Sequence, residues 1–142
     1  MQPDLIITPF GESADPGTIR PIPESTGPSD PKQNASWEKG FPISTMTAIS
    51  AGGIPPEGPD MNGVLNAISE HTVFIGGGSQ YKWSDEYVAA KGGYAKGSVI
   101  QSDDGDFSYV SAVDGNSVNF NDDPSSIGVQ WIHYSGPEIA AQ

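Results

Sequence analysis

One segment of the chain, residues 60–75, carries apolar residues at the spacing of a helix. The residues that share one helical face are Met61, Val64, Leu65, Ile68, Thr72 and Ile75, with Thr72 as the polar member. Offsets of three and four residues bring side chains to one side of an α-helix. A run of prolines that ends at Pro59 precedes the segment, and the glycines Gly76–Gly78 follow it. We therefore predict an amphipathic helix over Asp60–Ile75, with Asp60 as its N-cap.

The apolar face of this helix is a candidate contact between copies of the chain. Its predicted contact residues are Met61, Val64, Leu65 and Ile68. Gly63, in the first turn, costs about 1 kcal/mol relative to Ala in an isolated helix. Close approach by the backbone of another chain would explain this glycine. A tolerated defect would explain it as well.

Short segments with alternating side chains follow one another after residue 98. They are Val99-Ile100, Phe107–Val113, Ser117–Asn121 and Val129–Tyr134. Turn sequences rich in Asp, Asn and Gly separate the first three of them. Short strands joined by such turns are typical of an antiparallel meander. We therefore predict a small antiparallel β-meander in this part of the chain.

The segments on either side of the helix carry weaker signals. Phe41–Ile54, which includes Gly52-Gly53, reads as an extended lead-in to the helix. On the other side, Ser84 is placed to cap a single helical turn, with Asp85 and Glu86 near the positive end of the helix dipole.

Residues 1–40 lack both helical and strand periodicity. Eleven of the 13 prolines of the chain lie at or before Pro59, and proline fixes its own φ and removes a backbone donor. An extended N-terminal arm is therefore predicted, with simple disorder as the alternative. The apolar residues favour an arm that docks onto a partner protein, because a disordered tail has little use for them. The predicted docking residues are Leu5, Ile6, Ile7, Phe10, Ile22 and Trp37.

These elements define a fold class and a division of the chain. We predict an oligomeric α+β protein with an extended Pro-rich N-terminal arm, one short amphipathic helix and a small antiparallel β-meander. The anchoring arm is expected over residues 1–40, the lead-in and docking helix over 41–80, and the β domain over 81–142. A core is expected only in the second half of the chain, and burial against copies or a partner would add to its stability.

The formal charge of −12 limits the classes of partner that the chain can bind. It comes from 18 acidic and 6 basic residues, and phosphate binding needs clustered Lys and Arg. We therefore expect neither nucleic acid nor an anionic membrane surface as a partner. No apolar run approaches the ~20 residues of a membrane span, the N-terminus lacks the pattern of a signal peptide, and cysteine is absent. We expect the chain to be made in the cytoplasm, without membrane insertion.

Catalytic chemistry has weak support in the sequence. His71 and His133 have no carboxylate at metal-ligand spacing, and no nucleophile elbow or phosphate-binding loop is present. The carboxylates of Asp103–Asp106 and Asp122-Asp123 are of the kinds that cleave glycosides or bind Ca²⁺, but they lie in turn sequences, where Asp is expected for backbone reasons. We expect no enzymatic activity, no cofactor and no metal site.

Aromatic residues are consistent with one binding function, the recognition of a polysaccharide. The candidate stacking residues are Tyr81, Trp83, Tyr109 and Trp131, because aromatic planes match the flat apolar faces of sugars. The order of Tyr94, Gly97–Val99, Tyr109, Asp123-Pro124 and Trp131 is similar to that in small chitin- and cellulose-binding modules. The other interpretation is that Tyr109 and Trp131 form the core of a very small domain.

Several segments together resemble the N-terminal modules of bacteriophage and prophage tail-fibre proteins. The segments are Pro9–Pro23, Ala35–Pro42, the lead-in from Phe41-Pro42 to Thr45-Met46, Gly52–Ile68, Gly76–Tyr81 and Lys91–Gly105. With their surroundings they cover the chain from about residue 9 to residue 131.

The resemblance implies a structural protein of a phage virion, at the tail or in a fibre attached to it. It implies other tail proteins as partners of the N-terminal arm, and a homotrimer. The chain ends at Gln142 without a long repetitive shaft. A short tail fibre or a fibre-attachment connector therefore fits better than a long fibre that itself recognises the host.

Overall fold

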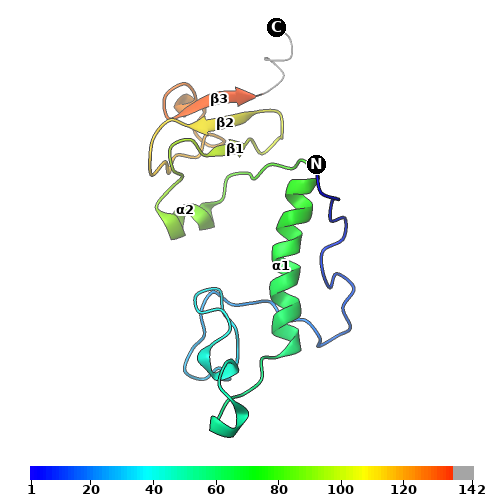
Figure 1. Ribbon diagram of the computed structural model, residues 1–142. Coiled ribbons are helices and arrows are strands. Elements are labelled where there is room, and N and C mark those ends of the chain that lie inside the picture. The colour runs from blue at the N-terminus through cyan, green and yellow to red at the C-terminus, as the bar shows by residue number, and fades with distance from the viewer. Residues whose placement is uncertain (136–142) are drawn as a thin grey trace. The chain divides into compact units, whose positions relative to one another are not determined.

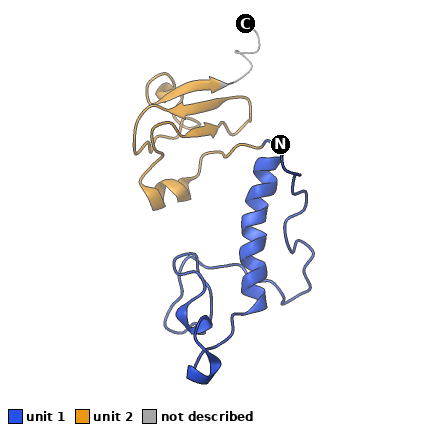
Figure 2. Cartoon of the chain, viewed as in Figure 1, with its two compact units in different colours: residues 1–78 blue, residues 79–142 orange. Residues whose placement is uncertain are grey.

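Two α-helices, three short 3-10 helices and one three-stranded antiparallel sheet make up the regular structure of residues 1–135, the part of the chain that the computed structural model describes (Figure 1). The α+β class predicted from the sequence is therefore confirmed. The chain divides into two compact units, Met1–Gly78 and Ser79–Gln142 (Figure 2). The helix α1 belongs to the first unit, and the helix α2 and the sheet belong to the second.

Helix α1 spans Gly58–Gly76, slightly more than the predicted range. Pro59 fits the first turn, where a missing backbone donor costs nothing, and Gly78, with φ of 79°, follows the last turn. The prediction that Asp60 is the N-cap is wrong. The N-cap is Glu57, which makes no side-chain capping bond, and Asp60 lies inside the first turn with its side chain turned to other partners.

The N-terminal segment, residues 1–22, runs beside α1 in the opposite direction (Figure 1). Leu5 lies near Gly76 at the end of the helix. The amide of Phe10 donates a hydrogen bond to the hydroxyl of Ser69. The amide of Arg20 donates one to the carbonyl of Pro59 at the beginning of the helix. This segment has no helix or strand of its own.

The predicted extended lead-in is replaced by two short 3-10 helices, η1 (Ile43–Thr45) and η2 (Ile49–Ala51). The hydroxyl of Thr45 donates to the carbonyl of Pro42 at 2.7 Å, and that of Thr47 donates to Ile43 at 2.8 Å. Side-chain bonds of this kind compete with extended structure. Apolar and polar residues do not alternate regularly in this segment, so no strand pattern opposes the two 3-10 helices.

The sheet of the second unit is a meander of β1 (Val99–Gln101), β2 (Ser108–Ser111) and β3 (Trp131–Ser135), in that order. All its pairs are antiparallel, as predicted, and Ile100, Tyr109 and His133 are aligned across it. Ser117–Asn121, predicted as a strand, is not one. There the side chain of Asn119 accepts from the amide of Asn121 at 3.0 Å, which favours a turn over a strand.

An aromatic cluster forms the core of the second unit. Its buried members are Tyr94, Ile100, Tyr109, Phe120 and Trp131. Trp131 is 0% exposed, its ring lies 5.1 Å from that of Phe120, and its Nε1–H donates to the carbonyl of Val118 at 2.7 Å. A buried Trp is stabilised when its N–H has such a partner.

Helix α2, Asp85–Lys91, confirms the helical turn predicted from Ser84. The hydroxyl of Ser84 accepts from the amide of Tyr87 at 3.1 Å, as an N-cap does. Asp85 lies in the first turn and Lys91 in the last, so both complement the helix dipole.

Gly63 of α1 is buried because the N-terminal segment passes directly over it. A Cβ at this position would lie 1.9 Å from the carbonyl oxygen of Arg20 and 3.3 Å from Cδ1 of Ile22. The close backbone approach that the sequence suggested is therefore real, but the approaching backbone belongs to the same chain.

Gly63→Ala is expected to destabilise the first unit. In an open helix this change stabilises by about 1 kcal/mol, but here the backbone at Arg20 must move away from α1. We expect a net loss of about 2 kcal/mol in the free energy of unfolding, measured by urea denaturation. Gly58→Ala is the matched control, because a Cβ at Gly58 meets nothing within 4 Å. Equal stability of the two variants would contradict the close approach.

Candidate functional site

The carboxylate of Asp60 joins two distant parts of the first unit to the beginning of α1. Asp60 is 0% exposed. Its Oδ1 accepts a hydrogen bond from Nη2 of Arg20, and the two side chains form an ion pair. Its Oδ2 accepts a hydrogen bond from the amide of Ala35 at 2.8 Å. A buried carboxylate is stable only when its oxygens have such partners. Asp60 is thus the anchor point of the segment that contains Arg20 and Ala35.

The rest of the N-terminal segment is attached to α1 through its backbone. The amide of Phe10 donates to Oγ of Ser69 at 2.7 Å, and its carbonyl accepts from Nδ2 of Asn66 at 2.9 Å. Farther along, the carbonyl of Thr18 accepts from Nδ2 of Asn62 at 2.8 Å. The polar side chains of α1 therefore hold the segment without using its apolar side chains.

The predicted docking residues are largely accessible in this arrangement. The exposed ones are Leu5, Ile6, Ile7, Phe10 and Trp37, whereas Ile22 is half-buried. Ile7 is the most open of them at 76% exposed. Aliphatic and aromatic groups that gather on a surface mark interaction sites more often than scattered ones do.

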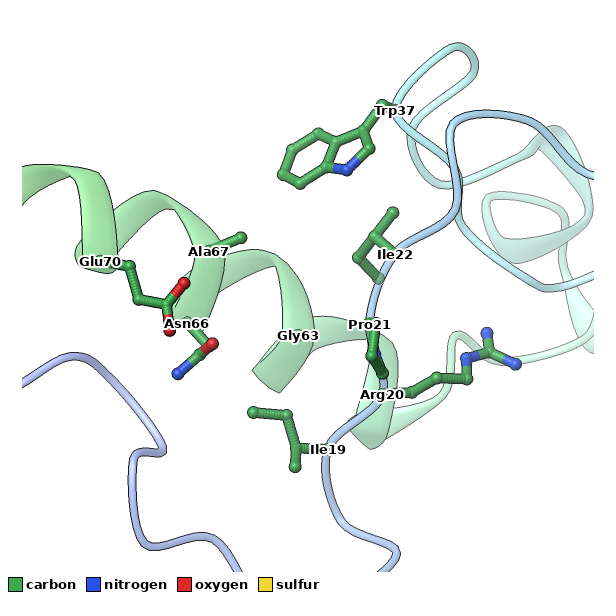
Figure 3. Close-up of a pocket in the computed structure, with 9 residues that line it drawn as sticks. All are labelled: Ile19, Arg20, Pro21, Ile22, Trp37, Gly63, Asn66, Ala67 and Glu70. Carbon is green, nitrogen blue, oxygen red and sulfur yellow. The ribbon is translucent and has the colours of Figure 1, made fainter. Parts of the chain in front are cut away.

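Two of these docking residues, Ile22 and Trp37, line a pocket of about 380 Å³ against α1 (Figure 3). The floor of the pocket includes Gly63 and Ala67. Figure 3 shows the guanidinium of Arg20 directed away from the pocket, consistent with its bond to Asp60. The pocket therefore combines apolar lining residues with one acidic residue, Glu70.

A second hollow, of about 350 Å³, brings the two predicted sets of contact residues together. We call it the α1 groove, and its lining residues are Ile6, Thr8, Phe10, Leu65, Ile68, Ser69 and Thr72. The predicted helix face contributes Leu65 and Ile68, and the predicted arm contributes Ile6 and Phe10. Met61 lies exposed on the same face, and Val64 is half-buried.

The aromatic residues proposed to stack on sugars do not form one surface. Tyr109 and Trp131 belong to the buried core, so their ring faces are closed to a sugar. Trp83 is half-buried, with its ring 5.3 Å from that of Tyr94, and its Nε1–H donates to Asp85 at 2.8 Å. Tyr81 is exposed. Stacking by this set would therefore depend on Tyr81 and the open part of Trp83.

The carboxylates considered for catalysis and Ca²⁺ binding act within their turns. The hydroxyl of Ser102 donates to Asp104 at 2.6 Å and the amide of Asp106 donates to it at 2.9 Å, and these bonds lower the pKa of Asp104. Asp123 accepts from the amide of Ser125 at 3.1 Å. Within residues 1–135, no group of three or more His, Cys, Asp or Glu side chains is arranged to hold a metal ion.

Two further observations concern the histidines and the helices. His133 lies among aromatic rings, 4.8 Å from that of Tyr109 and 5.3 Å from that of Phe107, while His71 lies on α1. None of the helices in the described part of the chain is long and apolar enough to cross a membrane.

Sequence reasoning missed the polar residues that assemble the site. Asn62, Asn66 and Ser69 hold the N-terminal segment, and their spacing of four and three residues is itself a helical stripe. That stripe could have been recognised as a second functional face of α1. The pairing of Arg20 with Asp60 had no local signal, because 40 residues separate the two side chains.

Asp60→Asn is expected to loosen the N-terminal segment. Either Arg20 or the amide of Ala35 would then face a donor, and the charge of Arg20 would lose its partner. Breaking a buried ion pair lowers the free energy of unfolding by about 3–5 kcal/mol. Because Arg20 is one-third exposed, water screens part of the pair, and we expect a loss of about 3 kcal/mol. Urea denaturation measures the loss, and faster hydrogen exchange at the amide of Ala35 locates it. Asp4→Asn, at an exposed position, is the control, and an unchanged Ala35 amide in Asp60→Asn would contradict the assignment.

The site thus consists of an apolar surface that polar contacts hold in place. It combines exposed residues of the N-terminal segment, a pocket beside Trp37 and the α1 groove. Comparison of the chain with protein-family models and with curated proteins gives no match.

Proposed function

We propose that the chain is a non-enzymatic structural protein of a bacteriophage virion, a short tail fibre or a fibre-attachment connector. It docks onto the tail through its N-terminal residues and presents the small β domain. Its partners are other tail proteins and further copies of itself as a homotrimer, and its location is the virion. The resemblance of residues 9–131 to tail-fibre modules suggests this role.

One observation carries the docking part of the proposal. The N-terminal segment is bonded to α1 through the backbone of Phe10, Thr18 and Arg20. Four of its docking residues, Leu5, Ile6, Ile7 and Phe10, are left exposed, and Ile7 is the most exposed of the four. A preordered segment loses less conformational entropy on binding than a disordered one. Such a segment suits a permanent attachment to a partner with apolar pockets.

The charge of the chain is consistent with assembly by specific contacts. At −12, unassembled chains repel one another and other acidic surfaces. Like-charge repulsion suppresses wrong partners, while apolar contacts supply affinity to the right one. Attachment would therefore depend on the apolar residues of the first unit.

Ile7→Asp is expected to prevent incorporation into particles. A carboxylate at this position would have to be buried without a partner in an apolar pocket of the tail. We expect about tenfold less of the variant chain in purified particles than of the wild type, measured by immunoblotting against a major particle protein. Ile7 is exposed, so the fold of the free chain should be unaffected.

The matched control is Val129→Asp, which places the same charge at a residue of the second unit that is 68% exposed. It should be incorporated as the wild type is. Wild-type incorporation of Ile7→Asp would refute docking through the N-terminal segment. Absence of the wild-type chain from particles would refute the virion role as a whole.

Exposed tyrosines of the second unit support the alternative function, binding of host polysaccharide. Tyr81 and Tyr87 are both exposed, and the ring of Tyr87 stacks on that of Tyr94 at 4.8 Å. Tyr81 is close in sequence to the half-buried Trp83. A sugar ring on this surface would change the environment of Trp83.

Under this alternative, purified host polysaccharide is expected to shift the tryptophan fluorescence of the chain. Tyr81→Ala should weaken the interaction about tenfold through loss of a stacking partner. Tyr134→Ala, at an exposed tyrosine outside the proposed surface, is the control. An unchanged spectrum at saturating polysaccharide would remove the alternative.

A further inference from the structure

A regular stripe of side chains runs along the face of α1 that the N-terminal segment leaves open. Its members are Met61, Leu65, Ile68, Thr72 and Ile75. They are separated by four, three, four and three residues, which is the a/d spacing of a coiled coil. Since an a-to-d step is three residues, Leu65 and Thr72 occupy a positions, and Met61, Ile68 and Ile75 occupy d positions.

The stripe is exposed along its full length. All five side chains are exposed in the structure, and Ile68, at its centre, is 54% exposed. The N-terminal segment uses other faces of α1, because it bonds to Asn62, Asn66 and Ser69 and passes over Gly63. The chain itself therefore leaves the a and d positions exposed, and Ile6 and Phe10 reach only the side of the α1 groove.

The α1 groove has the geometry that a coiled-coil neighbour requires. Its helical lining is Leu65, Ile68, Ser69 and Thr72. These residues stand at i, i+3, i+4 and i+7, the four-residue hole that receives one side chain of a facing helix. In a parallel, in-register pair, this hole receives the d residue at the same level, which is Ile68. Ile6 and Phe10 of the N-terminal segment extend the wall of the hole.

Charge does not oppose contact between copies along this stripe. Asp60 and Glu70 are the only charged residues in the sequence of α1, and neither occupies an a, d, e or g position. Asp60 is buried against Arg20. The flanking e and g positions hold Asn62, Ser69, Val64 and His71. An uncharged seam is the place where a chain of charge −12 can approach its own copies closely.

We propose that α1 helices of further copies pack in parallel and in register along this stripe, with Ile68 of each copy inserted into the α1 groove of the next. Leu at a with Ile at d favours bundles of more than two helices. Parallel helices in register are related by rotation about a common axis without translation, so the contacts close into a ring. This contact specifies the homo-oligomer of the proposed function, yet it involves only the chain itself and can be tested without a particle.

The oligomeric mass of the purified full chain tests the contact. Sedimentation equilibrium is expected to give a multiple, above two, of 14.9 kDa. Ile68→Glu should raise the dissociation constant by roughly a hundredfold or more, because each copy would bury an unpaired carboxylate in the seam. Its circular dichroism should match that of the wild type, because Ile68 is exposed in the single chain.

The matched control is Ile49→Glu, which makes the same change in η2 at a residue that is 74% exposed. It should associate as the wild type does. The proposal is overturned if the wild-type chain remains monomeric at a concentration of about 100 micromolar. It is also overturned if the Ile68→Glu and Ile49→Glu chains dissociate to the same extent.

Disulfide cross-linking tests the orientation, because the chain has no cysteine of its own. Ile75→Cys chains should cross-link to one another under oxidation, since a parallel register brings the same position together. If Ile75→Cys cross-links only when mixed with Met61→Cys, the helices are antiparallel and the proposal fails. Association without entry into particles would preserve this contact and refute the virion role instead. Entry of monomeric chains into particles would do the reverse.

Discussion

The buried carboxylate of Asp60 is the interaction on which the first unit depends. It fixes Arg20 and the amide of Ala35 to the first turn of α1. Both groups lie in segments that have no helix or strand. A charged group buried in this way has a stable state only with its partners in place. The close passage of the backbone over Gly63 lies next to this anchor, so the ion pair and the glycine together set the course of the N-terminal segment.

The consequence is a unit that polar contacts hold together more than apolar burial does. Within residues 1–78, all of which the structure describes, Ala35 is the only buried apolar side chain. The second unit instead buries a cluster of aromatic and aliphatic residues around Trp131. Apolar burial is the main driving force of folding, so the first unit leaves most of that driving force unused. Contact with a partner or with further copies would supply it.

Local rules predicted most of the fold. The periodicity of α1, the cap at Ser84 and the three strands of the meander all follow from residues close in sequence. The errors arose where side-chain contacts overrode such rules. Asp60 has the residue type of an N-cap, but its carboxylate instead accepts a hydrogen bond from Arg20, which is distant in sequence. In residues 43–51, threonine hydroxyls bonded to backbone carbonyls favour 3-10 turns over extended chain.

The candidate site could be predicted as parts and not as an assembly. Helical periodicity found Leu65 and Ile68, and the apolar composition of residues 1–40 found Ile6 and Phe10. No sequence rule pairs these two sets, because their contact depends on hydrogen bonds between the backbone of Phe10 and the side chains of Asn66 and Ser69. These two polar side chains therefore orient the N-terminal segment, which contributes Ile6 and Phe10 to the wall of the α1 groove. The proposed self-association would therefore be coupled to attachment of the segment, since anything that releases the segment also removes one side of the α1 groove.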